Sequence, residues 1–310
     1  MSRKSLVLVS VLVVGVLLAV SLYDTFDPNV DLKDKRVIVC GASTGIGEQI
    51  AYLYARAGAR LVLVSRRLQV LQQVQAKCRD LGAAQVEVFA GDLSFKNTSK
   101  GVIEYSEEKL GGFDHLILNH VIGYYTVWSS KSDLDYATKV VEVDLLSYIY
   151  LTTYSLPALE RSHGSVVAVS SAVGLSPLAL THVYSASKFG LHGFFGSLRQ
   201  DLMIQKSNVS ISLVALGLFG TDNTKANTKD KLPDVLKMYG DPADAAYAIA
   251  RTATLRLRQC NYPYAETKLL QWVHSLFPSL VDGVMVHLFQ DRLPHLYEGQ
   301  TPYGLNTYNS

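Results

Sequence analysis

The stretch RVIVCGASTGIGEQ, residues 36–49, joins a short β-branched run to three glycines and the start of a helical segment. Glycine adopts backbone angles that are closed to other residues, and it lets the main chain approach a ligand closely. Gly41, Gly45 and Gly47 lie where the positive end of a helix attracts a pyrophosphate. Their spacing, GxxxGxG, differs from the general GxGxxG fingerprint. The position between a strand and a helix nevertheless favours a nucleotide site over a plain tight turn.

The chain beyond this stretch alternates between apolar strand candidates and long helical segments. Fully apolar strands separated by helices are typical of a parallel sheet that is covered on both faces. Right-handed crossovers then predict a doubly wound α/β fold of the Rossmann type, with ligands at the carboxyl ends of the strands. The predicted strands are 36–40, 60–65, 86–90, 115–119, 164–171 and 209–217, and helices are predicted up to 57, from 68 onward, and near 95–110, 133–158 and 184–206.

The C-terminal part of the chain departs from this alternation. A polar stretch, 218–240, precedes a helix for which Asp241 is the expected N-cap and Pro242 the first residue. An apolar helical region, 268–290, is interrupted at Pro278 and is interpreted as a core or dimer helix. The chain is therefore divided into a signal-anchor helix with its linker (1–30), a Rossmann-type domain (31–265) and a helical extension with a loop-like tail (266–310).

Residues 6–23 form an uncharged apolar run directly after Arg3 and Lys4. About 18 helical residues span about 27 Å, which is close to the hydrocarbon thickness of a bilayer. This length favours a membrane anchor over a cleaved signal peptide, although AVS at 19–21 is an acceptable cleavage site. A buried element fits this run less well. The positive-inside rule keeps the basic end in the cytosol and sends the rest of the chain across the membrane.

Two glycosylation sequons, at Asn97 and Asn208, agree with a domain on the far side of that membrane. The expected location is the membrane of the endoplasmic reticulum, with a single pass and a lumenal domain. Secretion after cleavage of a signal peptide is the alternative.

The composition argues against several other classes of protein. With 29 basic and 27 acidic residues the net charge is +2, which gives no electrostatic case for binding nucleic acid. The three cysteines, Cys40, Cys78 and Cys260, are isolated and form neither a CxxC pair nor a disulfide framework. No His/Cys spacing predicts a zinc site, so no metal is expected.

The end of the second strand indicates which dinucleotide is bound. An NAD site usually places a carboxylate there to accept a hydrogen bond from the ribose 2′-hydroxyl. This strand ends instead in Ser65, Arg66 and Arg67. Because guanidinium groups suit a 2′-phosphate, we expect NADP(H), with Arg66 as the main ligand and Arg67 as a second. A solvated basic turn is the alternative. Asp92, after the third strand, is expected to bond the adenine amino group.

VYSASKFG, residues 183–190, sets Tyr184 and Lys188 one helical turn apart on one face. The fifth strand ends at Ser171, thirteen residues before Tyr184. A phenol has a pKa of about 10, and a nearby ammonium lowers that pKa by favouring the phenolate. Tyr184 is then suited to exchange a proton with a substrate, while Lys188 lowers its pKa and holds a nicotinamide ribose, and Ser171 orients the substrate oxygen. These are the parts that hydride transfer to or from a carbonyl carbon needs.

Together these motifs resemble the short-chain dehydrogenase/reductase family over about residues 34–260. The resemblance is carried by GASTGIG (41–47), LILNH (116–120), Ser171 and YSASK (184–188). The segments EVDLLSY, YSASKFGLHGFF, NVSIS and LGLFGT are similar to the 11-beta-hydroxysteroid dehydrogenase branch of that family. This resemblance implies an N-terminal anchor, a lumenal NADP(H)-dependent domain, a homodimer and a steroid-like or other lipophilic substrate.

The resemblance also assigns further site residues. It places Asn119 beside the cofactor beyond the fourth strand, and Gly217 with Thr221 on the nicotinamide side. The expected cofactor contacts are Gly41, Ser43, Thr44, Gly45, Ile46, Gly47, Arg66, Arg67, Asp92, Leu93, Asn119, Tyr184, Lys188, Gly217, Leu218 and Thr221, and the expected substrate contacts are Ser171, Leu178 and Tyr184.

Four positions depart from the family pattern. Asp144 stands where the family has an asparagine that supports a water-mediated proton path to the lysine, so it is a candidate relay residue with a changed charge. Cys40 replaces a threonine, and Thr44 replaces a basic residue, which leaves more of the phosphate binding to the two arginines. Leu178 replaces a tyrosine that is common in the steroid-reducing branch, so an apolar substrate is expected but a glucocorticoid less so.

Two functions from different classes fit these observations. One is an NADP(H)-dependent oxidoreductase that interconverts a ketone and a secondary alcohol on a lipophilic substrate, with a retinoid or xenobiotic carbonyl reductase as the alternative within the class. The other is a catalytically weak NADP(H)-binding scaffold, which Asp144 would indicate. The intact Ser171, Tyr184 and Lys188 favour the enzyme.

Overall fold

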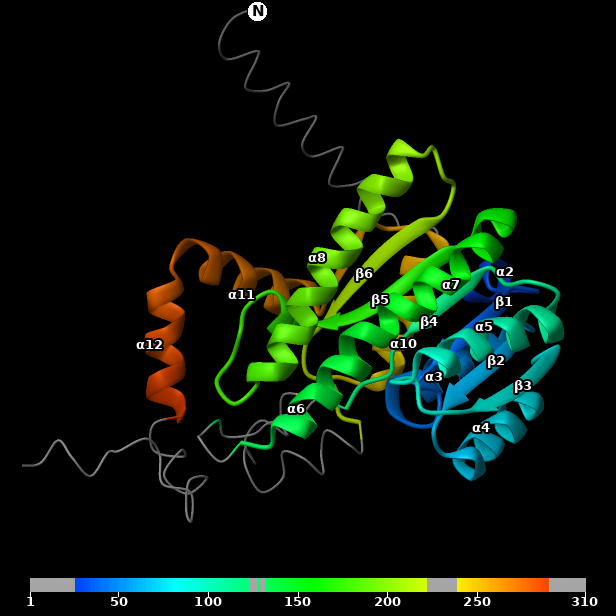
Figure 1. The fold of residues 1–310 in the computed structure, drawn as a ribbon, viewed down its shortest axis with the longest axis horizontal. Helices are drawn as coiled ribbons and strands as arrows, with labels where there is room; N and C mark the ends of the chain where they lie inside the picture. The colour runs from blue at the N-terminus through cyan, green and yellow to red at the C-terminus, as the bar shows by residue number, and fades with distance from the viewer. Residues whose placement is uncertain (1–25, 123–127, 129–131, 222–238, 290–310) are drawn as a thin grey trace, which may run out of the picture.

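The computed structural model describes residues 26–122, 128, 132–221 and 239–289 (Figure 1). The predicted anchor and the predicted loop-like tail at 295–310 lie outside these residues. Most of the polar stretch 218–240 does as well.

A parallel sheet of seven strands forms the centre of the domain, in the order β3-β2-β1-β4-β5-β6-β7. The six predicted strands are confirmed, with small shifts at their ends. A seventh, β7, was not predicted and pairs in parallel with β6 at one edge of the sheet. The strands are β1 (Arg36–Cys40), β2 (Arg60–Ser65), β3 (Gln85–Ala90), β4 (His115–Leu118), β5 (Ser165–Ser171), β6 (Ser210–Leu216) and β7 (Gln259–Tyr262).

Helices cover both faces of the sheet, as the apolar strands predict. Within β1, Val37 and Val39 pack on one face while Ile38 and Cys40 pack on the other, and all four side chains are buried. One layer contains α3 (Gly45–Arg56), α4 (Leu68–Asp80) and α10 (Pro242–Thr254), and the other contains α5 (Lys96–Leu110), α7 (Ser147–Ser162) and α8 (His182–Ile204). A short helix, α2 (Pro28–Asp31), contacts α3 and α10.

The strand order reverses between β1 and β4. The chain runs outward through β2 and β3 and then returns to place β4 on the other side of β1. Helices that leave neighbouring strands in opposite directions open a crevice at the carboxyl ends of those strands, which is where ligands bind in open α/β sheets. The chain therefore has a single-domain, doubly wound Rossmann-like fold.

The helix predicted near 133–158 is interrupted. α6 (Leu134–Val141) passes into a π-helix, η1 (Glu142–Leu146), which continues directly into α7. A π-helix widens the turn and is common at functional sites. Here it contains Asp144, the residue that departs from the family pattern.

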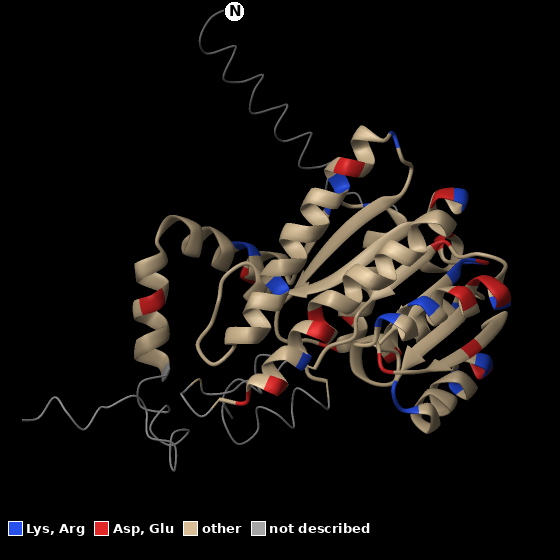
Figure 2. Cartoon of the chain, viewed as in Figure 1, with Lys and Arg blue, Asp and Glu red and all other residues tan. Residues whose placement is uncertain are grey.

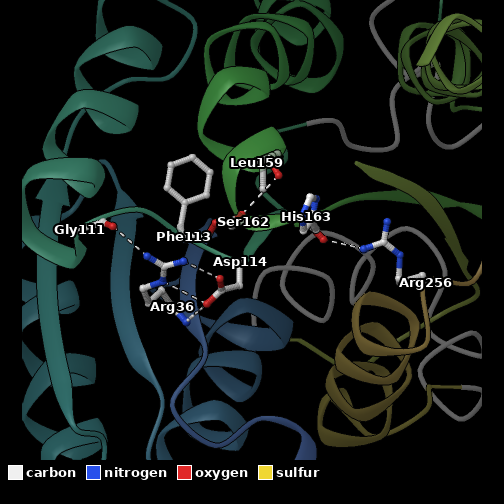
Figure 3. A network of polar contacts seen from close by, with 8 residues as sticks. All are labelled: Arg36, Gly111, Phe113, Asp114, Leu159, Ser162, His163 and Arg256. Carbon is white, nitrogen blue, oxygen red and sulfur yellow. Dashed lines mark hydrogen bonds and ion pairs between the residues drawn. The ribbon is translucent and has the colours of Figure 1, made fainter. Parts of the chain in front are cut away.

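A polar network lies at the amino ends of the strands, away from the crevice at their carboxyl ends (Figure 3). The Arg36 guanidinium donates to both carboxylate oxygens of Asp114, with Nη2 2.7 Å from Oδ1, and also to the Gly111 carbonyl. Arg256 donates to the His163 carbonyl at 2.6 Å. The Arg36 contacts join the start of β1 to the turn before β4, and the Arg256 contact joins the segment after α10 to the turn before β5.

The C-terminal helices α11 (Tyr264–Leu276) and α12 (Pro278–Phe289) break at Pro278, as predicted. They are not core helices, because their large apolar side chains are exposed, Trp272 by 56% and Leu276 by 70%. Asp282 is the only charged residue on α12 (Figure 2). Among the described residues no single helix is long and apolar enough to cross a membrane, while α11 and α12 together pass that test as a pair bent by 116°.

Local chemistry elsewhere agrees with the sequence. Asp241 caps α10 by accepting a hydrogen bond from the Ala243 N–H at 2.8 Å. The three cysteines are free thiols, with Cys40 and Cys78 buried and Cys260 half-buried. Burial raises the pKa of Cys40 far above its ordinary range.

Candidate functional site

One large cleft, with a volume of about 910 Å³, lies at the carboxyl ends of the central strands. Its walls come from the segments that follow β1 to β6, from α6 and α8, and from α11. Most of the predicted site residues line it, namely Gly41, Ser43, Thr44, Ile46, Arg66, Arg67, Asp92, Leu93, Asn119, Ser171, Leu178, Tyr184, Lys188, Gly217, Leu218 and Thr221. Gly45, Gly47 and Asp144 are not among the lining residues, and of these Gly47 and Asp144 are buried.

The glycine turn is shaped for close approach. Gly41 has φ +84°, and a Cβ there would lie 2.7 Å from the Cα of His120, which follows β4. A Cβ on Gly47 would lie 2.1 Å from the Gly41 carbonyl oxygen. Only glycine fits both positions. The N-cap of α3, Thr44, makes no side-chain capping bond, so the first N–H groups of this helix are left for a ligand at its positive end.

Both predicted phosphate ligands lie at the rim of the cleft, and they differ in their contacts with the glycine turn. Arg66 is exposed. Arg67 is also exposed and reaches back to the glycine turn, where Nη2 donates to Ser43 Oγ at 3.0 Å and to Thr44 Oγ1 at 3.2 Å. A positive charge is thus held against the hydroxyl groups of the turn.

Asp92 has a partner that the sequence did not reveal. Lys139, on α6, lies 3.2 Å from Asp92 Oδ2 and also contacts the Ser94 hydroxyl. Burial raises the pKa of Asp92, but hydrogen bonds from Ser94 and the Lys139 ammonium outweigh burial and hold that pKa below its usual range. Asp92 and Lys139 are 47 positions apart in the sequence, which explains why no local pattern indicated this pair.

The structure brings Ser171, Tyr184 and Lys188 into the same cleft. Ser171 ends β5, and its Oγ accepts a hydrogen bond from the Val173 N–H at 3.4 Å. Tyr184 and Lys188 come from the first two turns of α8, and Lys188 Nζ lies 5.6 Å from the centre of the Tyr184 ring. An ammonium at this range attracts the face of the ring and favours the ionised form of the phenol.

Lys188 is almost completely buried, with 2% of its surface exposed. Its Nζ donates to the Val169 carbonyl at 3.2 Å and lies 5.1 Å from the centre of the Tyr148 ring. Burial lowers the pKa of Lys188, and the charge of Asp144, which is fully buried, acts in the opposite direction.

Further polar residues around Lys188 are joined by hydrogen bonds. The Tyr148 hydroxyl donates to the His120 carbonyl at 2.8 Å, and His120 Nε2 lies 2.5 Å from the Ser147 Oγ. Beyond the lysine, His192 Nε2 lies 3.1 Å from the Ser170 Oγ. Burial, together with the Lys188 charge, lowers the pKa of His120 to about 3 and that of His192 to about 4, so both rings are neutral near pH 7.

The remainder of the cleft is mainly apolar. Leu178 lines it as predicted, and Val173 lies on the same wall. The sequence did not indicate the contribution of α11, whose Glu266, Thr267 and Leu270 also line the cleft. Leu270 lies about one turn after the adjacent Glu266 and Thr267, so the three share one helix face, a pattern that predicts a helix but not what the helix covers.

The two sequon asparagines are not among the lining residues of the cleft and are exposed. Asn97 is in the first turn of α5, and Asn208 precedes β6. Within the described residues no group of His, Cys, Asp or Glu side chains could hold a metal ion.

Comparison with known proteins agrees with this geometry. The family model for short chain dehydrogenases matches residues 35–232. A Gallus gallus protein called Hydroxysteroid 11-beta-dehydrogenase 1-like protein is 43% identical over 276 residues, which cover 89% of this chain and 93% of the relative.

Proteins with the same name from two other species are similar to the chain as well. The Xenopus tropicalis protein is 44% identical over 78% of this chain and 83% of its own length. The Danio rerio protein is 41% identical over 82% of this chain and 87% of its own length. With a match of this extent and a cleft at the strand reversal, the chain belongs to the short-chain dehydrogenase family of oxidoreductases, which use nicotinamide cofactors.

Proposed function

We propose that the protein is an NADP(H)-dependent oxidoreductase that interconverts a ketone and a secondary alcohol on a steroid-like or other lipophilic substrate. The observation that carries this proposal is the position of Lys188 Nζ, 5.6 Å from the Tyr184 ring in the cleft that Ser171 also lines. A phenol beside a buried ammonium is a device for moving a proton, and a hydroxyl beside it can hold the oxygen that receives the proton.

The proposed roles follow from the placement of the three side chains. In reduction, the Tyr184 hydroxyl donates its proton to the carbonyl oxygen, and in oxidation the phenolate takes the proton from the alcohol. Lys188 stabilises the phenolate through its charge. Ser171 orients the substrate oxygen by hydrogen bonding. Lys188 Nζ donates to the buried Val169 carbonyl. Because His120 and His192 are neutral, Lys188 carries the positive charge in this part of the described site.

The chain fits a dinucleotide. Gly41 and Gly47 allow the turn to pack closely, because a Cβ at either position would clash with neighbouring main-chain atoms, and α3 presents uncapped N–H donors to a pyrophosphate. Arg66 and Arg67 are suited to a 2′-phosphate. Asp92 is suited to the adenine amino group, and Gly217 with Thr221 to the nicotinamide side. When bound, the cofactor supplies or accepts the hydride.

The proposed substrate class rests on the walls and on the relatives. Leu178, Val173 and Leu270 offer apolar surface in the cleft, which favours a lipophilic molecule. The printed names of the relatives refer to hydroxysteroids. The same walls would also accept a retinoid or a xenobiotic ketone, so the choice within this class is made by experiment.

We further propose a lumenal domain that is anchored in the endoplasmic reticulum membrane and forms a homodimer. The location is supported by the apolar run at 6–23, which follows two basic residues, and by the two sequons, while the homodimer is what the resemblance to the hydroxysteroid branch implies. Protease protection of the catalytic domain in sealed microsomes, together with a mobility shift on endoglycosidase treatment, is the expected result. Digestion of the domain without detergent would contradict this location.

The decisive experiment is turnover by the full-length protein in detergent. A panel of steroid, retinoid and small aromatic ketones is supplied with NADPH or NADH, and the corresponding alcohols with NADP⁺ or NAD⁺. We expect NADPH oxidation with at least one apolar ketone, and its loss in Tyr184→Phe. Tight NADPH binding without turnover on any substrate would instead support the scaffold function.

A further inference from the structure

Both polar main-chain groups of Ile122 are held by side chains from other elements. The Ile122 N–H donates to Asp144 Oδ1 at 2.9 Å, and the Ile122 carbonyl accepts from the Tyr136 hydroxyl at 2.6 Å. Tyr136 belongs to α6 and Asp144 to η1, whereas Ile122 follows β4. Two side-chain partners on one residue replace the ladder partners that a strand would supply, and they fix the position of that residue.

The residue held in this way is part of the cleft wall. Ile122 lines the cleft beside Val121, and Tyr136 lines it as well. Asp144 is fully buried and is not a lining residue, so it holds Ile122 from behind. The position of the Ile122 side chain against a ligand therefore depends on two hydrogen bonds, and one of these is made outside the cleft.

The chemistry of residue 144 explains why two residues share this task. An ionised carboxylate accepts hydrogen bonds but donates none, so Asp144 can satisfy the Ile122 N–H but not its carbonyl. The Tyr136 hydroxyl supplies the missing donor. An asparagine carries an acceptor and a donor on one side chain and could satisfy both groups.

We propose that Asp144 and Tyr136 are a pair of positioning residues that hold Ile122 and thereby determine how well a lipophilic substrate fits the cleft. The inference rests on the proposed oxidoreductase function in one respect, because the fit is measured as the KM for a ketone. It gives the side chain of Asp144 a role that is distinct from proton transfer.

The first test is a four-protein cycle of the wild type, Tyr136→Phe, Asp144→Asn and the double variant, assayed at saturating NADPH. Tyr136→Phe should raise the KM for the ketone about threefold to tenfold, because one half-buried acceptor loses its donor, while kcat changes little. Asp144→Asn should restore the KM in the Tyr136→Phe background, since an amide can donate to the Ile122 carbonyl. Matched controls are Tyr150→Phe, a half-buried tyrosine on α7, and Asp135→Asn, an exposed acid on α6.

The second test needs no turnover. Hydrogen exchange of the peptide that contains residues 119–122 is measured by mass spectrometry on the full-length protein without substrate. Tyr136→Phe should speed exchange in this peptide several-fold, while Tyr150→Phe should leave it unchanged. If the wild type reduces no ketone but exchange responds in this way, the proposed function fails and the positioning of Ile122 stands.

Unchanged KM and unchanged exchange in Tyr136→Phe would overturn the inference. An increase in KM that Asp144→Asn does not reverse, in a double variant that folds, would overturn the division of labour between the two residues. If the double variant does not fold, the KM and the exchange rate of Tyr136→Phe against its control decide the matter.

Discussion

Lys188 shows how burial and charge compete at a single residue. A buried ammonium is costly unless hydrogen bonds and an opposite charge compensate it. The Val169 carbonyl supplies the hydrogen bond, and two aromatic rings face the charge. Asp144 supplies the negative charge that opposes the effect of burial on the pKa of Lys188. The departure from asparagine at this position thus changes the charge around Lys188, the residue that stabilises the proposed proton donor, Tyr184.

Asp144→Asn should therefore change the pH dependence of turnover. Asp144 raises the pKa of Lys188, so removal of its charge lowers that pKa further, and the ammonium is lost at lower pH. We expect the alkaline limb of the kcat–pH profile to move to lower pH.

Three of the titratable groups around Lys188 do not obscure its effect on the pH profile of turnover. Tyr184 and His192 lie on the same helix, Tyr148 on α7 and His120 after β4. Burial lowers the pKa of both histidines to about 3–4, and it raises the pKa of Tyr148 well above its usual value, so these three groups do not titrate near neutrality. An alkaline limb in the same place for Asp144→Asn, the wild type and Asp135→Asn would refute this account. If the Asp144 carboxylate impairs the water-mediated proton path to Lys188, turnover by Asp144→Asn should also be faster near pH 7.

Two arginines should determine cofactor preference. Because both lie at the rim of the cleft, Arg66→Ala and Arg67→Ala should each lower kcat/KM for NADPH by about tenfold or more while NADH changes little. Arg67→Ala should also disturb the glycine turn through Ser43 and Thr44. Arg79→Ala, an exposed arginine on α4, is the matched control. Equal losses with both cofactors would exclude a role in phosphate recognition.

Among the elements, the turn from β1 into α3 tolerates the least change. Gly47 packs against the Gly41 carbonyl, while Gly193 of α8 has nothing within 4 Å of where a Cβ would lie. The same substitution therefore has opposite consequences at two helical positions of one chain.

Gly47→Ala should destabilise the fold and abolish dinucleotide binding, because the added methyl group cannot be placed without moving the turn. Gly193→Ala should stabilise the protein by about 0.5–1 kcal/mol, since alanine loses less backbone entropy in a helix. Urea unfolding and NADPH fluorescence titration measure both effects. Normal binding by Gly47→Ala would show that the turn does not hold the cofactor.

Local patterns predicted most elements, and the exceptions have physical reasons. β7, with the sequence QCNY, lacks an apolar run because it is a short edge strand, and it is defined by its pairing with β6. The π-helix η1 has ordinary helical residues, and nothing in their spacing indicates the wider turn. Ser171, Tyr184 and Lys188 could be found because they lie close together in sequence, whereas Lys139 and Leu270 reach the cleft from distant segments that folding brings together.

Across the whole molecule, the two ends of the sheet have different tasks. The carboxyl ends of the strands open into the cleft, while the amino ends are tied by Arg36, Asp114 and Arg256 (Figure 3). Burial raises the pKa of Asp114, but the hydrogen bonds and charge of Arg36 outweigh burial and hold that pKa below its usual range. The carboxylate therefore stabilises the fold above its unfolded pKa, and this contribution is lost as pH falls through the lower folded pKa.

Asp114→Asn should lower the free energy of unfolding by about 1–2 kcal/mol at pH 7. The difference from wild type should begin to shrink below about pH 4, where the carboxyl of the unfolded chain is protonated, and it should shrink further as pH falls through the lower folded pKa. Urea midpoints at pH 7 and pH 3 measure this, with Asp80→Asn, exposed at the end of α4, as the control. NADPH affinity should not change, because the pair lies at the other end of the strands. A difference from wild type that is the same at both pH values would contradict the assignment.

The placement of sulfur has a consequence for the conditions under which this protein can work. None of the described residues that line the cleft is a cysteine or a methionine. Cys40, directly beneath the glycine turn, is fully buried, and its raised pKa keeps it as the unreactive thiol. Oxidants and thiol-specific reagents therefore find no sulfur to react with in the described walls of the site.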